Sequence, residues 1–152
     1  MQTKIFLLIL TFLVTSFTGQ AQKTNSVATT AERLNFTKPE EVRTFPLGKV
    51  DLIKIGGAMI GKAVFQPGWK WSESVKPMAK TNSCEAPHFQ YHISGILRIK
   101  MDDGTTFDCK PGDVSYLPMG HDAWVIGKEP VVVIDFQGMI DYATANPVGS
   151  KQ

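Results

Sequence analysis

The stretch CEAPHFQYHISG, residues 84–95, brings together side chains that bind metal ions in many proteins. It contains two of the three histidines of the chain and one of its two cysteines. Alternate side chains of a β-strand share a face, so His88, Gln90 and His92 would point to one side, and Cys84 would join them if the strand runs straight. Thiolate and neutral imidazole are good ligands for Zn, Cu, Fe or Ni. The stretch therefore predicts one wall of a divalent transition-metal site.

The third histidine, His121, follows the sequence PMG at the end of the strand-like segment VSYLP. A glycine turn at a strand end can place a loop side chain over the mouth of a sheet. We therefore predict metal ligation by Cys84, His88 and His121, with His92 as an alternative third ligand. A second interpretation stays open. Buried histidines are often satisfied by backbone carbonyls and cysteine packs as a small apolar residue, so the same side chains could line a metal-free pocket or the core.

The two cysteines also raise the question of a disulfide. The segments ILRIKM and TTFDC flank Asp102, Asp103 and Gly104, a sequence typical of a hairpin turn. Pairing about this turn places Cys109 opposite Leu97, far along the chain from Cys84. At about 3.3 Å per residue the two cysteines would lie well beyond the roughly 7 Å between Cα atoms that a disulfide allows. A bridge would need a sharp bend at Gly95, so the spacing favours free thiols.

The beginning of the chain has the pattern of a secretory signal peptide. Lys4 precedes the apolar run IFLLILTFLV, and small and polar residues follow up to a predicted cleavage point near Ala21. The run is shorter than the roughly 20 residues of a membrane-spanning helix. We therefore expect a signal peptide at 1–21, a flexible arm at 22–44, one folded domain at 45–140 and a tail at 141–152. The predicted location is the periplasm or the outside of the cell, not a membrane.

Composition and patterning restrict the fold and the partners. The formal charge of +2 gives no electrostatic reason to expect nucleic acid or an anionic membrane as a partner. From about Phe45, short apolar stretches alternate with turns rich in Gly, Pro, Asp and Asn. Regularly spaced short strands of this kind are typical of an all-β sandwich or barrel. No stretch before the tail has a convincing helical period.

Two motifs then suggest a family. The segments APHFQYHISG and GDVSYLPMGHDAW, within residues 50–137, resemble the cupin superfamily, whose fold is a single small jelly-roll β-barrel. Gly112, Asp113, Pro118 and Gly120 match the framework of the second cupin motif. The ligand positions differ, however. Alignment on Tyr91 and Gly95 puts His88 at the glutamate position of the first motif and Asn82 and Cys84 at its histidine positions, while Ala123 takes the histidine position of the second motif. The resemblance therefore implies a rearranged metal site rather than the family's usual one.

The segment FQPGWKWS resembles a group of small bacterial cupin-like proteins with a PGWKWS-type sequence. Trp69 and Trp71 would lie on one side of an extended segment and could present an apolar surface to a ligand, although capping of the core explains them equally well. The resemblance implies a small molecule bound inside the barrel, contacted by Trp69, Trp71 and either Gln90 or His92. It also implies pairing of two copies, since cupins often form homodimers. The alternative is a metal-free domain that binds or senses a small molecule without catalysis.

Overall fold

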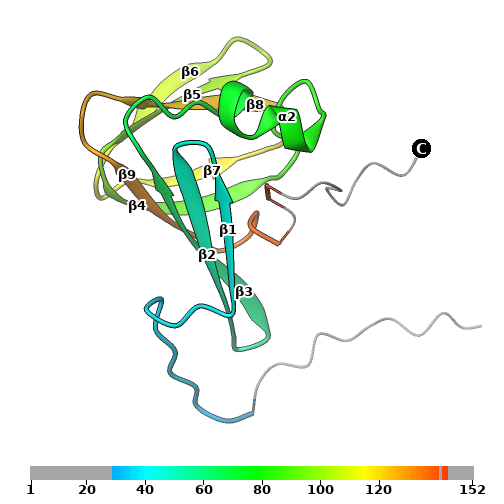
Figure 1. The fold of residues 1–152 in the computed structure, drawn as a ribbon, viewed down its shortest axis with the longest axis vertical. Coiled ribbons are helices and arrows are strands. Elements are labelled where there is room, and N and C mark those ends of the chain that lie inside the picture. Colours follow the sequence, from blue (N-terminus) through cyan, green and yellow to red (C-terminus); the bar gives the residue numbers. More distant parts are fainter. Residues whose placement is uncertain (1–28, 141, 144–152) are drawn as a thin grey trace, which may run out of the picture.

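The computed structural model describes residues 29–140, 142 and 143. The predicted signal peptide, the beginning of the arm and most of the tail lie outside these residues. Two antiparallel sheets dominate the fold (Figure 1). Within the described residues, nine strands and two short helices follow one another in the order β1 (Glu41–Phe45), β2 (Gly48–Ile55), β3 (Ala58–Phe65), α1 (Trp71–Ser74), α2 (Lys76–Ala79), β4 (His88–Ser94), β5 (Ile96–Met101), β6 (Thr106–Cys109), β7 (Val114–Leu117), β8 (His121–Ile126) and β9 (Val131–Asp135).

The strands form one six-stranded sheet in the order β1-β2-β3-β9-β4-β7 and one three-stranded sheet in the order β6-β5-β8. The prediction of an all-β fold is confirmed. The barrel is not closed, because no ladder of strand pairing joins the two sheets among the described residues. Side chains from both sheets, such as Phe65 and Leu117 on one side and Ile99 on the other, instead meet in a shared core.

The hairpin predicted around residues 102–104 is present. β5 pairs with β6 in the register that places Leu97 opposite Cys109, as the sequence predicted. Gly104 has a φ of +91°, a backbone conformation that glycine adopts without strain. Both Cys84 and Cys109 are buried free thiols, in agreement with the expectation from their spacing.

Two local expectations need correction. Residues 41–44 are not part of an arm, because β1 begins at Glu41 and pairs along its length with β2. This strand is mostly exposed and has no apolar alternation, so the sequence pattern does not reveal it. Helices α1 and α2 were also not expected. Each has only four residues, which is too short to show a helical period.

No helix in the described part of the chain is long and apolar enough to cross a membrane.

Candidate metal centre

Strand β4 points its polar side chains inward. The inward side chains are buried and the outward ones are exposed; the buried ones are His88, Gln90 and His92, and the exposed ones are Phe89, Tyr91 and Ile93. This alternation is the one that the sequence predicted. Inward imidazole and amide groups on a strand are unusual in an apolar core, and each must find a polar partner there.

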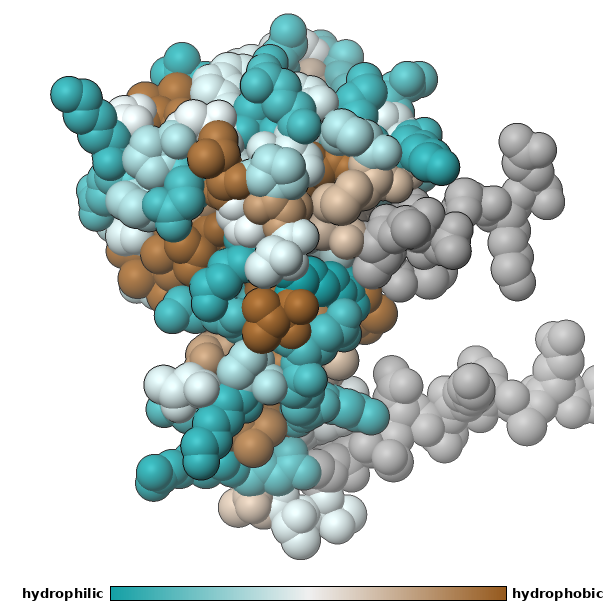
Figure 2. All heavy atoms as spheres, viewed as in Figure 1, coloured by the Kyte–Doolittle hydropathy of each residue, from teal (hydrophilic) through white to brown (hydrophobic). Residues whose placement is uncertain are grey.

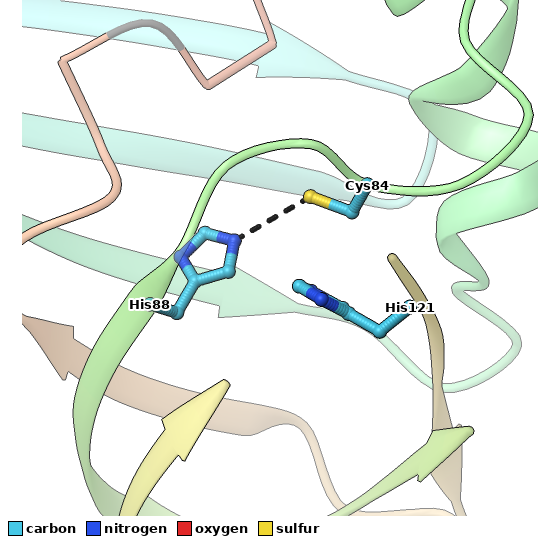
Figure 3. A group of neighbouring side chains, drawn as sticks. All are labelled: Cys84, His88 and His121. Carbon is cyan, nitrogen blue, oxygen red and sulfur yellow. Dashed lines mark hydrogen bonds between the residues drawn. The ribbon is translucent and has the colours of Figure 1, made fainter. Parts of the chain in front are cut away.

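Backbone pairing brings Cys84 and His121 together although they are far apart in the sequence. Cys84 N donates to His121 O at 2.8 Å, and Gly120 N donates to Cys84 O at 2.8 Å. This isolated bridge sets Cys84 against the first residue of β8. Cys84 is also four residues before His88, so both histidines converge on its thiol (Figure 3). Cys84, His88 and His121 are each about 3% exposed.

The three side chains have the spacing of a ligand set. One ligand atom from each of Cys84, His88 and His121 lies within 4.8 Å of the other two. The distance from Cys84 Sγ to His88 Nε2 is 3.6 Å. Two such ligands on a tetrahedral zinc ion, with bonds of about 2.3 Å and 2.0–2.1 Å, would lie about 3.6 Å apart. The predicted ligand set is therefore assembled in one place.

Both histidines are oriented through their other ring nitrogen. His88 Nδ1 lies 2.6 Å from Asp135 Oδ2, and His121 Nδ1 lies 2.8 Å from the carbonyl oxygen of Pro118. A carbonyl oxygen only accepts, so His121 carries its proton on Nδ1 and donates it there. In metal-binding histidines such a donor bond fixes the tautomer and leaves Nε2 free for the ion. His88 Nδ1 is bound to Asp135 in the same way, so His88 Nε2 points toward the thiol of Cys84.

Asp135, at the end of β9, is a residue that the sequence analysis missed. It is fully buried and accepts four hydrogen bonds. Oδ2 receives His88 Nδ1 at 2.6 Å and Gln90 Nε2 at 3.0 Å, while Oδ1 receives the backbone amides of Gln137 and Gly138 at 2.8 and 2.7 Å. Burial alone would raise the pKa of Asp135, but the bond and charge of His88 and the amides of Gln137 and Gly138 hold the pKa below its ordinary value. The carboxylate is therefore charged and fixes two inward side chains at once.

The thiol and imidazole of the cluster shift each other's pKa. Burial would raise the pKa of Cys84, but hydrogen bonds with His121 and His88 lower it to about 6. Burial would lower the pKa of His88, but its bonds to Asp135 and Cys84 raise it to about 9. Cys84 is thus a thiolate near neutral pH, which is the form that binds metal.

His92 lies away from the cluster. Its Nε2 is 2.9 Å from Ser115 Oγ, and its Nδ1 has no partner among the described residues. It does not line the cavity beside His88 and His121. The prediction of His92 as an alternative metal ligand is therefore wrong, because its position two residues further along β4 carries it past the other ligands.

A small cavity of about 20 Å³ lies beside the cluster. Trp69, Trp71, His88, Gln90 and His121 line it together with apolar side chains from both sheets. The two tryptophans are only 2% exposed, so they belong to the core as well as to the cavity wall and do not surround an open entrance. Of the four residues expected to contact a ligand, Trp69, Trp71 and Gln90 reach this cavity.

No protein-family model matches the chain, and neither does any curated protein. Solved structures do. A protein of unknown function from Rhizobium leguminosarum aligns with a TM-score of 0.53 and 16% identity over 72% of this chain and 97% of that one. A cupin-like protein from Thermotoga maritima aligns with a TM-score of 0.44 and 16% identity, over 61% of this chain and 69% of that one.

A variant of Bacillus subtilis oxalate decarboxylase aligns with a TM-score of 0.48 and 25% identity, over 68% of this chain. The alignment with the Rhizobium leguminosarum protein, whose TM-score is above 0.5, shows that the two chains share a fold. The chain spans only 29% of the length of the decarboxylase. The Cys84, His88 and His121 cluster must be interpreted from its own chemistry.

Proposed function

We propose that the protein binds one divalent transition-metal ion through Cys84 Sγ, His88 Nε2 and His121 Nε2. The observation that carries the proposal is the convergence of these three ligand atoms within 4.8 Å. The donor bonds from both Nδ1 atoms support it, because they turn both Nε2 atoms toward the thiolate. His88, whose pKa is about 9, gives up its Nε2 proton when the ion binds.

The ligand types indicate which ions fit. A thiolate with two imidazoles is a soft set, which favours Zn or Cu, and then Fe or Ni, over Mn or Mg. Three protein ligands leave the fourth position of a tetrahedral ion free for water or substrate. An ion held there would act as a Lewis acid on whatever binds beside it.

We also propose that the two sheets are the halves of a jelly-roll barrel and that a small molecule binds between them. The side chains of this chain would then have distinct tasks: Asp135 orients His88, and the apolar wall separates the site from bulk solvent. The apolar run after Lys4 supports export of the protein to the periplasm or the outside of the cell.

The second candidate is a metal-free cupin-fold domain that binds or senses a small molecule. It is favoured by the contact between Cys84 Sγ and His88 Nε2, because 3.6 Å is also a suitable distance for a thiol and imidazole hydrogen bond. The two candidates differ in whether an ion lies among the three side chains.

The test is metal analysis of untagged protein purified from its own compartment and then incubated with excess Zn²⁺ and dialysed. We expect close to one equivalent in the wild type and a loss of most of it in Cys84→Ser and in His121→Ala. Cys109→Ser and His92→Gln are matched controls, since they change the other cysteine and the other buried histidine without touching the cluster. They should keep the metal.

Circular dichroism establishes that each variant is folded before its metal content is compared. Binding should also raise the melting temperature of the wild type, because an ion that binds only the folded state stabilises it. A wild-type protein without metal after incubation with Zn, Cu, Fe and Ni would leave the metal-free candidate in place.

A further inference from the structure

Two buried polar atoms beside the proposed ligands have no hydrogen-bond partner in the described part of the chain. They are Gln90 Oε1, an acceptor, and Trp69 Nε1, a donor. Both residues line the cavity that His88 and His121 border. Buried donors and acceptors are normally satisfied by protein groups or by bound water, and leaving them unpaired is costly. Opposite hydrogen-bonding roles on the wall of one cavity therefore point to a molecule that binds in it.

The orientation of the Gln90 amide follows from Asp135. Gln90 Nε2 donates to Asp135 Oδ2 at 3.0 Å, and that oxygen also receives His88 Nδ1. Rotating the amide by half a turn would set Oε1 against a carboxylate, so that two acceptors met. The carboxylate therefore decides that Oε1, and not Nε2, is the free atom of the side chain.

The indole of Trp69 is equally constrained. It stacks on Phe65, with ring centroids 3.9 Å apart and an angle of 20° between the planes. Trp69 also borders an open cleft with Lys70 and Trp124. Its Nε1 atom is nevertheless closed to solvent, so the cleft does not provide its partner.

We propose that this cavity is a binding site for one hydroxyl group, which donates to Gln90 Oε1 and accepts from Trp69 Nε1. The volume of about 20 Å³ suits one water-sized group. A hydroxyl both donates and accepts, whereas a halide only accepts and an ammonium ion only donates. Apolar side chains such as Leu97, Ile99 and Leu117 form much of the remaining wall and disfavour a charged ligand.

The proposal deepens the proposed function, because it rests on the same cavity as the metal ligands. The hydroxyl belongs either to water or to the end of a small alcohol. Gln90 and Trp69 then determine which molecules approach the cluster, selecting a neutral hydroxyl over anions of similar size. The two hydrogen bonds themselves do not need the ion, so they can be tested with and without it.

The test is NMR spectroscopy of isotope-labelled protein. It follows the indole N–H resonance of Trp69, which is assigned by its loss in Trp69→Phe. We expect a cross-peak between this proton and a long-lived water molecule in the wild type. The cross-peak should persist in Gln66→Leu, a matched change at an exposed glutamine, and disappear in Gln90→Leu. Adding methanol distinguishes water from an alcohol as the owner of the hydroxyl. If methanol replaces the water, its methyl protons should give a cross-peak to the same indole proton and the water cross-peak should weaken.

A wild-type protein without any cross-peak from water or methanol would overturn the proposal, as would an unchanged water cross-peak in Gln90→Leu. If Gln90→Leu does not fold, a crystal structure of the wild type decides. The proposal requires an ordered oxygen about 2.7–3.2 Å from Gln90 Oε1. An empty cavity would contradict it.

Measurement of metal-free and zinc-incubated protein separates this proposal from the metal site. A cross-peak in protein that takes up no metal after incubation with Zn, Cu, Fe and Ni would reject the metal site and support the hydroxyl site. One equivalent of zinc with no cross-peak in either form would reject the hydroxyl site and support the metal site.

Discussion

Asp135 connects the cluster to the turn that follows β9. It holds His88 through Oδ2 and the chain after β9 through Oδ1. In Asp135→Asn one of the two oxygens becomes an NH2 group, which cannot accept from the donors that surround it. We expect zinc affinity to fall about 10- to 100-fold, the usual effect of losing the partner of a ligating histidine. Competition with a chelator of known affinity measures the change.

Asp51→Asn is the matched control for this prediction. Asp51 is also buried, but its carboxylate pairs with Lys49 at 2.8 Å on another part of the sheet. Zinc affinity in Asp51→Asn should stay near that of the wild type even if stability falls. Equal losses in the two variants would mean that Asp135 acts only through general stability.

His92 should make the fold sensitive to acid. Burial lowers its pKa below the ordinary value of 6.5, despite the nearby charge of Asp113. The unfolded chain therefore binds a proton at His92 more readily than the folded one, and the free energy of unfolding falls as the pH drops below about 6.5. The slope from one such group approaches about 1.4 kcal/mol per pH unit at most.

The comparison is between wild type and His92→Gln in urea, both metal-free, at pH 7.5 and 5.5. The fall in the unfolding free energy between the two pH values should be smaller in the variant, which carries no titrating group at this position. Cys84 and His88 also titrate, but they do so in both proteins and cancel in the difference. An identical fall in the two proteins would exclude His92 as a source of acid sensitivity.

At the scale of elements, the sequence predicted what depends on local patterns. The alternation of HFQYHI and the turn at residues 102–104 were enough to predict the inward face of β4 and the register of β5 with β6. Asp135 was missed because its role depends on β9 lying beside β4, with Gln90 opposite Asp135. The apolar residues before Asp135 indicate a buried strand, but its neighbour in the sheet cannot be determined from them.

Gly138, in the turn after β9, packs closely against the chain at the start of β4. A Cβ atom added to Gly138 would come within 2.5 Å of His88 Nδ1 and would also collide with the carbonyl oxygen of Pro87. Gly138→Ala should therefore displace His88, lower stability by about 1–3 kcal/mol and weaken zinc binding. Urea unfolding and chelator competition measure the two effects.

Gly48→Ala provides the comparison, because its added Cβ would meet the ring of Phe45 and no residue of the cluster. It should lower stability without changing zinc affinity. Zinc affinity that stays at the wild-type level in Gly138→Ala would show that the turn moves without disturbing His88.

At the scale of the whole molecule, the regular spacing of short apolar stretches predicted an all-β fold, whereas the division into two sheets required the structure. The outer face of the six-stranded sheet exposes several large apolar side chains to solvent. Phe89, Tyr91 and Ile93 on β4 and Val114 and Tyr116 on β7 are 44–65% exposed. Figure 2 shows hydrophobic side chains gathered over the part of the molecule where Figure 1 places β4 and β9. A contiguous apolar surface of this kind usually marks an interface.

We expect this face to pair two copies of the chain. Packing of this face against the same face of a second copy, about a two-fold axis, would cover Tyr116 and its apolar neighbours on both copies. Light scattering after size exclusion should therefore give a dimer mass, and Tyr116→Lys should shift it to a monomer.

Val42→Lys adds the same charge at an exposed position on β1, so it should leave the dimer intact. A monomeric wild type at micromolar concentration would show that the apolar face has another role, whereas loss of the dimer in both variants would indicate a general effect of charge.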